Sequence, residues 1–318
     1  MKRISLVFNF IFLSVLLIAC GEDSASSDDG NYVVTTGGTS GTLYSVGAAF
    51  SQTVNGSESS LNLTNQASGG AVENVRLMDS GDAQFSLFGG DMAQDAIDGM
   101  NDFEGESHED MLKGVFSIYD QPLNMVTLEG SGIESFSDLE GQTVAVGSPG
   151  SGNEVRTRQV IESLGLTYDD INAEFLSIEE GVEGIRDGQV DASIVWTGLP
   201  TPGIMDLASL DDIHMIPLTS EEVDDVVSDF PALYEHTIPG GTYDGVEEDV
   251  QTVSVNVQFY TAADTPDEDV YSFMEIIFDN TEELENSVST LEELSLETAD
   301  EDVIDLHPGA ERFFEENQ

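Results

Sequence analysis

The hydrophobic residues of this chain fall into two kinds of stretch that alternate along it. Short runs of β-branched, aromatic and aliphatic residues are typical of buried strands, and longer stretches with apolar residues three or four positions apart are typical of helices. We expect strands over residues 32–34, 60–68, 83–88, 115–119, 123–128, 143–146, 173–177, 192–196, 214–218 and 252–261. We expect helices over 46–50, 71–79, 153–164, 179–187, 266–278 and 281–296, another starting near 91, and short ones at 137–141 and at the C-terminal end.

This order of elements predicts the fold class. Strands that alternate with helices indicate an α/β fold with a largely parallel sheet, in which ligands bind beyond the carboxyl ends of the strands. The run 252–261 is the longest strand-like stretch of the second half, and we interpret it as a return crossing between two lobes, paired with 123–128 as the outgoing one. The acidic stretch 220–249 has no clear period, so we expect it to be irregular.

Two glycine-rich turns each follow an apolar run and precede a helix. The first spans residues 35–44 and the second spans residues 147–154. Such a turn points unpaired backbone N–H groups and the positive end of a helix dipole at a cleft, which suits an anion. Two of them in one chain suggest two lobes that present helix ends to a shared ligand.

The candidate ligand-binding residues come from these turns and from neighbouring strand ends. The set is Thr39, Ser40, Gly41, Tyr44, Ser68, Gly69, Asp91, Ser148, Gly150, Ser151, Gly152, Asn153, Trp196 and Thr197. The alternatives are that the serine and threonine residues only cap their helices and that Trp196 belongs to the core. Arg156 and Arg158 lie in the first turns of a predicted helix, where a cation is disfavoured. We therefore expect them, like Arg76, to pair with acids rather than to hold the ligand.

The N-terminal stretch has the order of a secretory signal. Lys2 and Arg3 precede an apolar run over residues 4–18, which leads to Leu17-Ile18-Ala19-Cys20-Gly21. This end resembles a bacterial lipobox, so we expect residues 1–20 to be a lipoprotein signal peptide and Cys20 to carry the lipid; the alternatives are a plain signal peptide or an uncleaved anchor. Residues 21–31, rich in Ser and Asp, are expected to be a flexible tether.

The composition is strongly acidic. The sequence has eight Lys and Arg against 63 Asp and Glu, and the loss of Lys2 and Arg3 with the signal would leave six basic residues and a formal charge of −57. Nucleic-acid binding needs the opposite sign and is excluded. The acids are spread along a chain in which 39% of residues are hydrophobic, which indicates a folded protein adapted to high salt rather than a disordered one.

The sequence contains no recognisable catalytic or metal-binding pattern. The four histidines have no metal-ligand spacing, the single cysteine lies at position 20, and neither a Gly-x-Ser-x-Gly elbow nor a phosphate-binding Gly-x-x-x-x-Gly-Lys loop occurs. We therefore expect no enzyme activity, no cofactor and no metal site. A cofactor-free hydrolase is the enzymatic alternative.

Six blocks of sequence carry a family resemblance. They are residues 36–44, 72–84, 146–154, 188–192, 198–202 and 306–311. In this order and spacing they resemble the TAXI family of TRAP-transporter solute-binding proteins, and the resemblance extends from about Tyr32 to Phe314.

The resemblance implies a bilobal receptor of the periplasmic-binding-protein type II, or Venus flytrap, class. Residues 32–125 and 256–318 would form lobe 1, and residues 126–255 would form lobe 2. Such a receptor would sit outside the cytoplasm, held to a membrane by its lipid, and deliver a small organic anion to a TRAP permease driven by an ion gradient. The family implies glutamate or a related dicarboxylate such as 2-oxoglutarate. A ligand-sensing lipoprotein on the same fold, signalling to a membrane partner, is the alternative.

Overall fold

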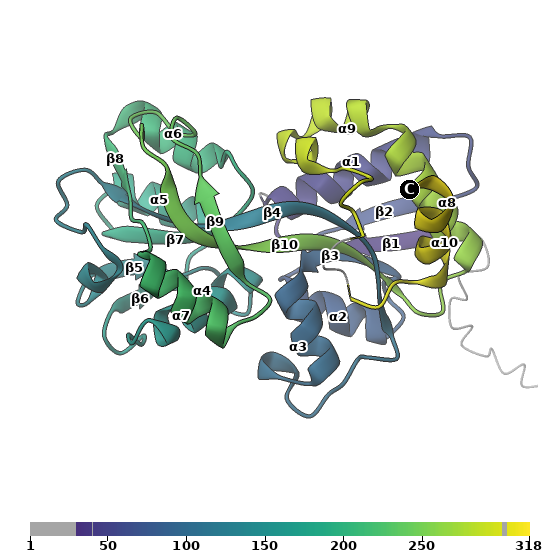
Figure 1. Ribbon diagram of the computed structural model, residues 1–318, viewed down its shortest axis with the longest axis horizontal. Coiled ribbons are helices and arrows are strands. Elements are labelled where there is room, and N and C mark those ends of the chain that lie inside the picture. The colour runs from purple at the N-terminus through teal and green to yellow at the C-terminus, as the bar shows by residue number, and fades with distance from the viewer. Residues whose placement is uncertain (1–29, 40, 301–303) are drawn as a thin grey trace, which may run out of the picture.

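The computed structural model describes residues 30–39, 41–300 and 304–318, and in it the chain forms two α/β lobes joined by two long strands (Figure 1). The expected signal peptide with Cys20, nearly all of the tether and Ser40 lie outside the described residues. Among the described helices, none is long and apolar enough to cross a membrane.

Lobe 1 is built on three parallel strands, with β1 between β2 and β3. Its N-terminal elements are β1 (Asn31–Thr35), α1 (Thr42–Gly56), β2 (Asn62–Gln66), α2 (Ala71–Asp79), β3 (Phe85–Gly89), α3 (Gly90–Asp98) and η1 (Asn101–Phe103). The C-terminal part of the chain returns to this lobe as α8 (Asp267–Asp279), α9 (Thr281–Ser287), η3 (Ser289–Glu293) and α10 (Pro308–Asn317).

Lobe 2 repeats the plan with β5 between β6 and β7, all three parallel. Its elements are η2 (Phe136–Leu139), β5 (Thr143–Ala145), α4 (Gly152–Ser163), β6 (Asn172–Glu174), α5 (Ile178–Arg186), β7 (Ala192–Trp196), α6 (Pro202–Leu210), β8 (Ile213–Met215), α7 (Ser220–Asp229) and β9 (Tyr234–Ile238). In both lobes the parallel strands confirm the predicted α/β pattern.

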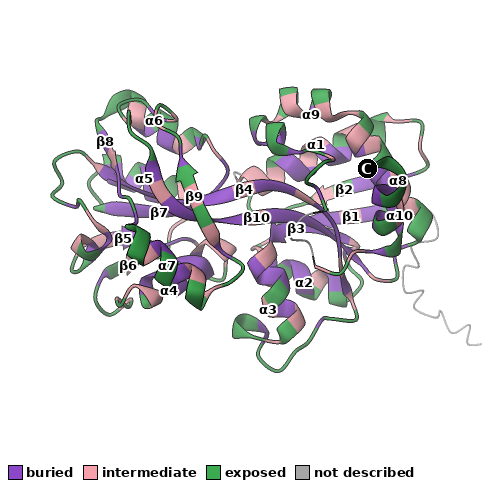
Figure 2. Cartoon of the chain, viewed as in Figure 1, coloured by how far each residue is buried: buried purple, intermediate pink, exposed green. Residues whose placement is uncertain are grey.

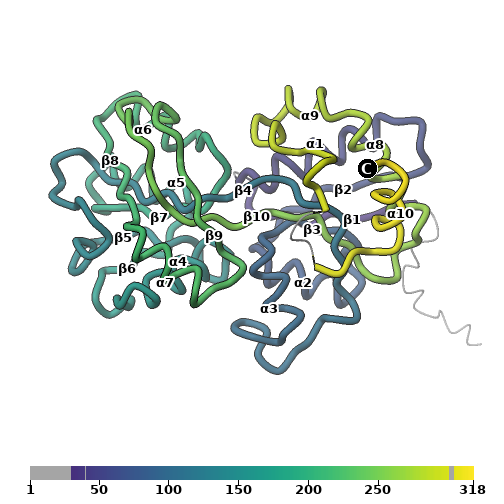
Figure 3. The backbone as a smooth tube through the Cα atoms, viewed as in Figure 1, coloured from purple at the N-terminus to yellow at the C-terminus, as the bar shows by residue number. Residues whose placement is uncertain are grey.

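The two crossing strands, β4 (Leu112–Leu128) and β10 (Val250–Ala262), run antiparallel to each other and pass from one lobe to the other. They join all the strands into one sheet with the order β2-β1-β3-β10-β4-β7-β5-β6, while β8 pairs with β4 and β9 with β10. The tube in Figure 3 shows these as the two places where the chain spans the gap between the lobes. Both strands are buried over most of their length (Figure 2).

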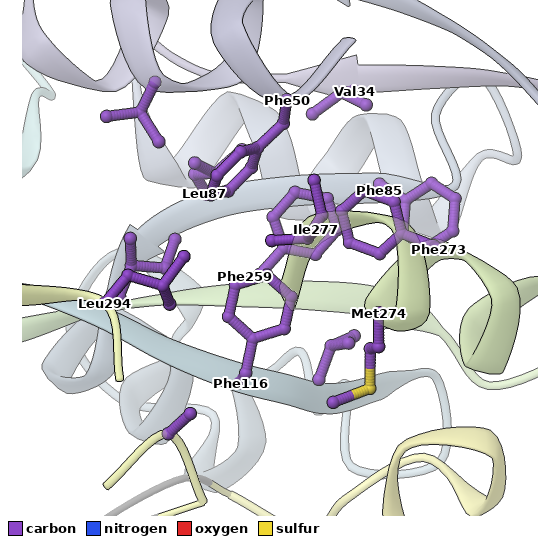
Figure 4. Close-up of a cluster of buried hydrophobic side chains, with 14 of the residues drawn as sticks. Val34, Phe50, Phe85, Leu87, Phe116, Phe259, Phe273, Met274, Ile277 and Leu294 are labelled. Carbon is purple, nitrogen blue, oxygen red and sulfur yellow. The ribbon is translucent and has the colours of Figure 1, made fainter. Parts of the chain in front are cut away.

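Each lobe has its own hydrophobic core, and the crossing strands contribute to both. In lobe 1, five phenylalanines from five elements pack together: Phe50, Phe85, Phe116, Phe259 and Phe273 (Figure 4). The rings of Phe116 of β4 and Phe259 of β10 are stacked, with centroids 5.4 Å apart. Farther along the same two strands, Leu123 and Val253 belong to the core of lobe 2.

Three expectations from the pattern were wrong in detail, and one helix was missed. Residues 115–119 and 123–128 are parts of one strand, because Pro122 sits within β4 without ending it. The stretch 220–249 is not irregular throughout, since it contains α7 and β9. The helix expected over 281–296 breaks into α9 and η3 at Val288. Helix α6 was not expected, because its Pro-rich start resembles a turn.

Candidate functional site

A cavity of about 320 Å³ lies between the two lobes. Its lining comes from both lobes and from Gln121 of the crossing strand β4. This size is at the lower end of the range for small-molecule sites, which are typically 300–1,000 Å³. The cavity therefore fits a compact ligand enclosed between the lobes.

Six helices begin at this cavity. The N-cap residues of α1 to α6 all line it, and they are Gly41, Gly70, Gly89, Ser151, Ser177 and Thr201. The first N–H groups of a helix have no partner within the helix, and the helix dipole places partial positive charge there. The six helix ends therefore give the cavity a positive electrostatic character that no excess of basic side chains supplies.

The wall from lobe 1 consists mainly of glycine-rich backbone. No side chain caps α1, α2 or α3, because the N-cap residue of each is glycine. Gly70 has φ +126°, a conformation that side chains rarely adopt, and a Cβ there would lie 3.3 Å from the Cα of Ser151 in lobe 2. The glycine thus permits the turns of the two lobes to approach closely.

The wall from lobe 2 is tied together by side chains. Asn153 donates from Nδ2 to the carbonyl oxygens of Val146 and Ile194, both at 3.1 Å, and its Oδ1 accepts from the backbone N–H of Trp196 at 2.7 Å. These bonds fix the start of α4 to the ends of β5 and β7. Ser151 accepts from the N–H of Glu154 at 3.2 Å and so caps α4.

The N-cap of α5, in the same wall, forms reciprocal hydrogen bonds with a residue of its own helix. The hydroxyl of Ser177 donates to Oε2 of Glu180 at 2.8 Å and accepts from the Glu180 N–H at 3.3 Å, forming a capping box at the start of α5. Hydrogen bonds from the backbone N–H and the hydroxyl of Ser177 lower the pKa of Glu180. The ordered cap presents a rigid edge to the cavity.

A buried ion pair crosses between the lobes beside the cavity. Arg156 of α4 donates from Nε to Oδ2 of Asp91 at 2.7 Å and from Nη2 to Oδ1 at 2.8 Å, and Asp91 belongs to α3 of lobe 1. The two residues are 3% and 9% exposed. Arg156 Nη1 also lies 3.4 Å from Oε1 of Gln121, and the guanidinium carbon is 5.8 Å from the centre of the Trp196 ring. Arg156 is part of the cavity lining, and its partner Asp91 is not.

One further contact joins the lobes at the cavity, and one buried donor beside it has no partner within the described residues. The hydroxyl oxygens of Thr42 in α1 and Thr197, just after β7, are 3.2 Å apart and connect the lobes. Trp196 is 2% exposed and lines the cavity, and its indole Nε1 has no hydrogen-bond partner within the described part of the chain. An unpaired buried donor is costly, so this N–H is a candidate to meet a ligand oxygen.

The structure brings together most of the residues that the sequence singled out. Those in the lining are Gly41, Ser68, Gly69, Ser148, Ser151, Gly152, Asn153, Trp196 and Thr197. Among the described residues, Thr39, Tyr44, Asp91 and Gly150 do not line the cavity. Asp91 instead binds Arg156, and Gly150 has φ +72°, so its part is to shape the turn. Ser40 lies outside the described residues.

Other lining residues were missed by the sequence reasoning. They include Thr42, Leu43, Gly70, Phe88, Gln121, Arg156, Ser177, Ile178, Glu179, Thr201 and Pro202. Ser177 and Thr201 had a usable signal, since each is a hydroxyl residue directly before a helix. Arg156 was expected to pair with an acid rather than to hold the ligand; the structure gives it Asp91 as a partner and also a place in the wall. No cluster of His, Cys, Asp or Glu suited to a metal ion occurs within residues 30–39, 41–300 and 304–318.

A comparison with solved structures finds similar chains at low sequence identity. One is a protein of Bordetella bronchiseptica RB50, with a TM-score of 0.51 and 13% identity over 81% of this chain and 76% of that chain. Others are the periplasmic aliphatic sulphonate binding protein SsuA of Escherichia coli, with a TM-score of 0.48 and 14% identity over 82% and 77%, and the substrate binding protein of an amino acid ABC transporter, with 0.46 and 11% over 82% and 99%. The expected bilobal α/β fold, with two lobes joined by two crossing strands, is confirmed.

A comparison with protein families covers nearly all of the described chain. The model of the NMT1-like family matches residues 34–317, from the middle of β1 to the end of α10. The match includes every element that lines the cavity. The chain belongs to the NMT1-like family.

Proposed function

We propose that this protein is an extracytoplasmic solute-binding receptor that captures a small organic anion between its lobes and delivers it to a membrane transporter. The observation that carries the proposal is the convergence of six helix N-termini on one enclosed cavity. Backbone N–H groups and helix dipoles bind carboxylate, sulfonate or phosphate groups. Since lobe closure creates the enclosure, capture and release follow from hinge motion at β4 and β10.

The apolar part of the lining suggests how the rest of the ligand is held. Leu43, Phe88, Trp196, Ile178 and Pro202 line the same cavity as the helix ends. A ligand with an acid group at the helix ends and a short carbon chain against these side chains would satisfy both parts of the wall. Nucleophilic or acid-base chemistry is not needed for this role.

The finer assignment rests on the sequence blocks. Their resemblance to the TAXI family supports a TRAP permease as the partner, and glutamate or 2-oxoglutarate as the ligand class. The resemblance to a lipobox at Cys20 supports lipid attachment to a membrane outside the cytoplasm. The excess of acidic residues supports a high-salt habitat. A sensory lipoprotein would use the same cavity, and a permease gene beside this one would favour transport.

The proposed lobe boundaries follow the exchange of cores along the crossing strands. Along β4 the side chains pass from the core of lobe 1 at Tyr119 to that of lobe 2 at Leu123, and along β10 they pass back between Val255 and Val257. We propose a lobe 1 of residues 32–125 and 256–318 and a lobe 2 of residues 126–255. The change of core on β10 supports the boundary at 256, whereas on β4 it lies between Tyr119 and Leu123, a few residues before 125.

Titration calorimetry tests the receptor function. The purified protein in molar NaCl would be titrated with glutamate, glutamine, 2-oxoglutarate, succinate and alanine. We expect micromolar or tighter binding of at least one carboxylate. Ser151→Ala should weaken it by about tenfold, because the Ser151 hydroxyl accepts from the Glu154 N–H but can still donate its proton to a charged ligand group, and that donor is lost. Ser163→Ala, on the same helix but bonded to Asp229 rather than facing the cavity, is the matched control.

The absence of heat with every one of these ligands, from protein shown to be folded, would reject the anion assignment. Equal affinity in Ser151→Ala and the wild type would place the ligand away from the start of α4.

A further inference from the structure

The buried ion pair Asp91–Arg156 occupies a position where a receptor for anions would be expected to keep a free cation. Arg156 is a cavity-lining residue with a side chain that is 4% exposed. Its guanidinium offers five N–H donors, of which Asp91 takes Nε and one on Nη2 in a bidentate arrangement. The charge of Arg156 is therefore already matched before any ligand arrives.

The wall is built to accommodate this pair. A Cβ at Gly89 would lie 2.0 Å from Nη2 of Arg156 and 2.5 Å from Oδ1 of Asp91, and a Cβ at Gly152 would lie 3.3 Å from Nη1. Glycine at both positions leaves room for the guanidinium and its carboxylate partner. The ion pair is therefore an integral part of the cavity wall, because the backbone beside it leaves the space that it occupies.

The charges around the cavity can be counted. The charged residues of its described lining are Arg156 and Glu179, and Glu179 is an exposed residue at the start of α5. With Asp91 included, the side chains supply no net positive charge. Helix ends contribute only partial charges, and a second buried anionic charge without a partner is expensive.

From this we infer that Asp91 is a specificity-determining residue: by holding Arg156, it makes the site select ligands with a single net negative charge over dianions. The inference rests on the proposed function and narrows its ligand class. Asp91 acts through Arg156 and does not itself touch the ligand. Freeing Arg156 would convert the site to one that accepts a ligand with a net charge of −2.

A charge series on one carbon skeleton tests this. Glutamate, glutamine and 2-oxoglutarate have net charges of −1, 0 and −2 at neutral pH and five carbons each. We expect the wild type to prefer glutamate to 2-oxoglutarate. In Asp91→Asn, which keeps the shape of the side chain, the ratio of the 2-oxoglutarate Kd to the glutamate Kd should fall by about tenfold or more.

Two variants separate the charge of Arg156 from other effects. Asp91→Asn with Arg156→Gln removes both charges and should bring the ratio back toward the wild-type value. Asp98→Asn removes an exposed acid from the same helix α3, bonded to Gln94 and not to Arg156, and should leave the ratio unchanged. Equal weakening of all three ligands in Asp91→Asn would overturn the inference and leave Asp91 as a contact between lobes only.

A ligand-independent measurement keeps this inference separate from the proposed function. Melting temperatures would be compared in sodium sulfate and sodium chloride at equal ionic strength, with sulfate as the dianionic probe. Sulfate should stabilise Asp91→Asn more than the wild type or the double variant, since only the single variant has an unmatched Arg156. Equal stabilisation of all three would be the general salt effect and would reject the inference. If the wild type bound none of the three organic ligands, the proposed ligand class would fail while this comparison would still decide the role of Asp91.

Discussion

The two walls of the cavity differ in how the N-termini of their helices are capped. In lobe 1 the N-caps of α1, α2 and α3 are all glycine and none has a side-chain cap. In lobe 2 the N-caps of α4, α5 and α6 are Ser151, Ser177 and Thr201, and the two serines cap their own helices. In lobe 1 the N–H groups of Gly69 and Gly70 are bonded to Glu73 and Ser68, but no N-cap side chain covers the first turns of the three helices. In lobe 2 the two serine hydroxyls hold the first turns of their own helices.

This difference indicates how one site can combine free backbone donors with an ordered wall. A helix that begins after glycine leaves its first N–H groups free to bind an anion. The cost is a few tenths of a kcal/mol of stability, because Ser, Asp or Asn would cap the helix better than glycine does. Glycine at these places also lets the lobes close, as the approach of Gly70 to Ser151 shows. We infer that lobe 1 supplies the open N–H donors and that lobe 2 supplies the fixed surface against which the ligand is held.

The largest effect should come from Gly70→Ala. Gly70 has φ +126° and ψ −167°, a region essentially restricted to glycine, so a side chain should cost about 1–3 kcal/mol of unfolding free energy. Because the new Cβ would also press on the backbone of Ser151, we expect ligand affinity to fall by more than about tenfold. Denaturant unfolding and calorimetry measure the two effects.

Gly56→Ala is the control for this prediction. It places the same methyl group at the end of α1, where nothing lies within 4 Å of the new Cβ, so stability and affinity should change little. Wild-type affinity in Gly70→Ala would mean that the two turns do not need to meet when the ligand binds.

A middle-sized effect, confined to stability, is expected from Ser177→Ala in lobe 2. Loss of this N-cap should cost about 1 kcal/mol at neutral pH, with ligand affinity within about twofold of the wild type, because the hydroxyl is already bonded to Glu180. The lowered pKa of Glu180 means that its contribution to stability is present above its ordinary pKa and is lost as the pH falls through the lower folded value. The cost of Ser177→Ala should therefore shrink as the pH is lowered below about 4.5.

Unfolding of the wild type and the variant at pH 7 and at pH 3.5 would measure this change. Thr219→Ala removes the matching capping box of α7, which does not line the cavity, and serves as the control for affinity. A loss of affinity in Ser177→Ala that Thr219→Ala does not share would show that the α5 cap contacts the ligand although its hydroxyl is bonded to Glu180, and it would break the comparison.

Local sequence signals were sufficient to predict helices whose two ends are marked by characteristic residues. Helix α2 begins after Gly70 and ends before Ser80-Gly81, and both its predicted ends match the structure. Helices α6 and α7 could have been found in the same way. Thr201 precedes Pro202 with Ile204 and Leu207 buried beyond it, and Thr219 with Glu222 forms a capping box.

Contacts between the two lobes could not be predicted from local sequence signals. Asp91 and Arg156 are 65 residues apart, and their pairing depends on how two separately formed lobes close on each other. The sequence places each beside a glycine-rich turn, which predicts nearness to the ligand but not that one neutralises the other. The same holds for Thr42 and Thr197, whose contact exists only across the gap between lobes.

The smallest effect, and the sharpest test of the two walls, is expected from Gly41→Ser. Gly41 has φ −85° and ψ 155°, which any residue can adopt, and a Cβ there would lie 3.4 Å from the carbonyl oxygen of Gly38. A serine would give α1 the kind of cap that α4 has, adding a few tenths of a kcal/mol to the unfolding free energy while taking an N–H from the ligand. We expect slightly higher stability together with weaker binding, measured by unfolding and calorimetry, whereas Gly41→Ala, which adds bulk without a hydroxyl, should not be stabilised. Tighter binding in Gly41→Ser would show that a hydroxyl serves the ligand as well as bare backbone does, and the division of labour between the walls would then rest on lobe closure alone.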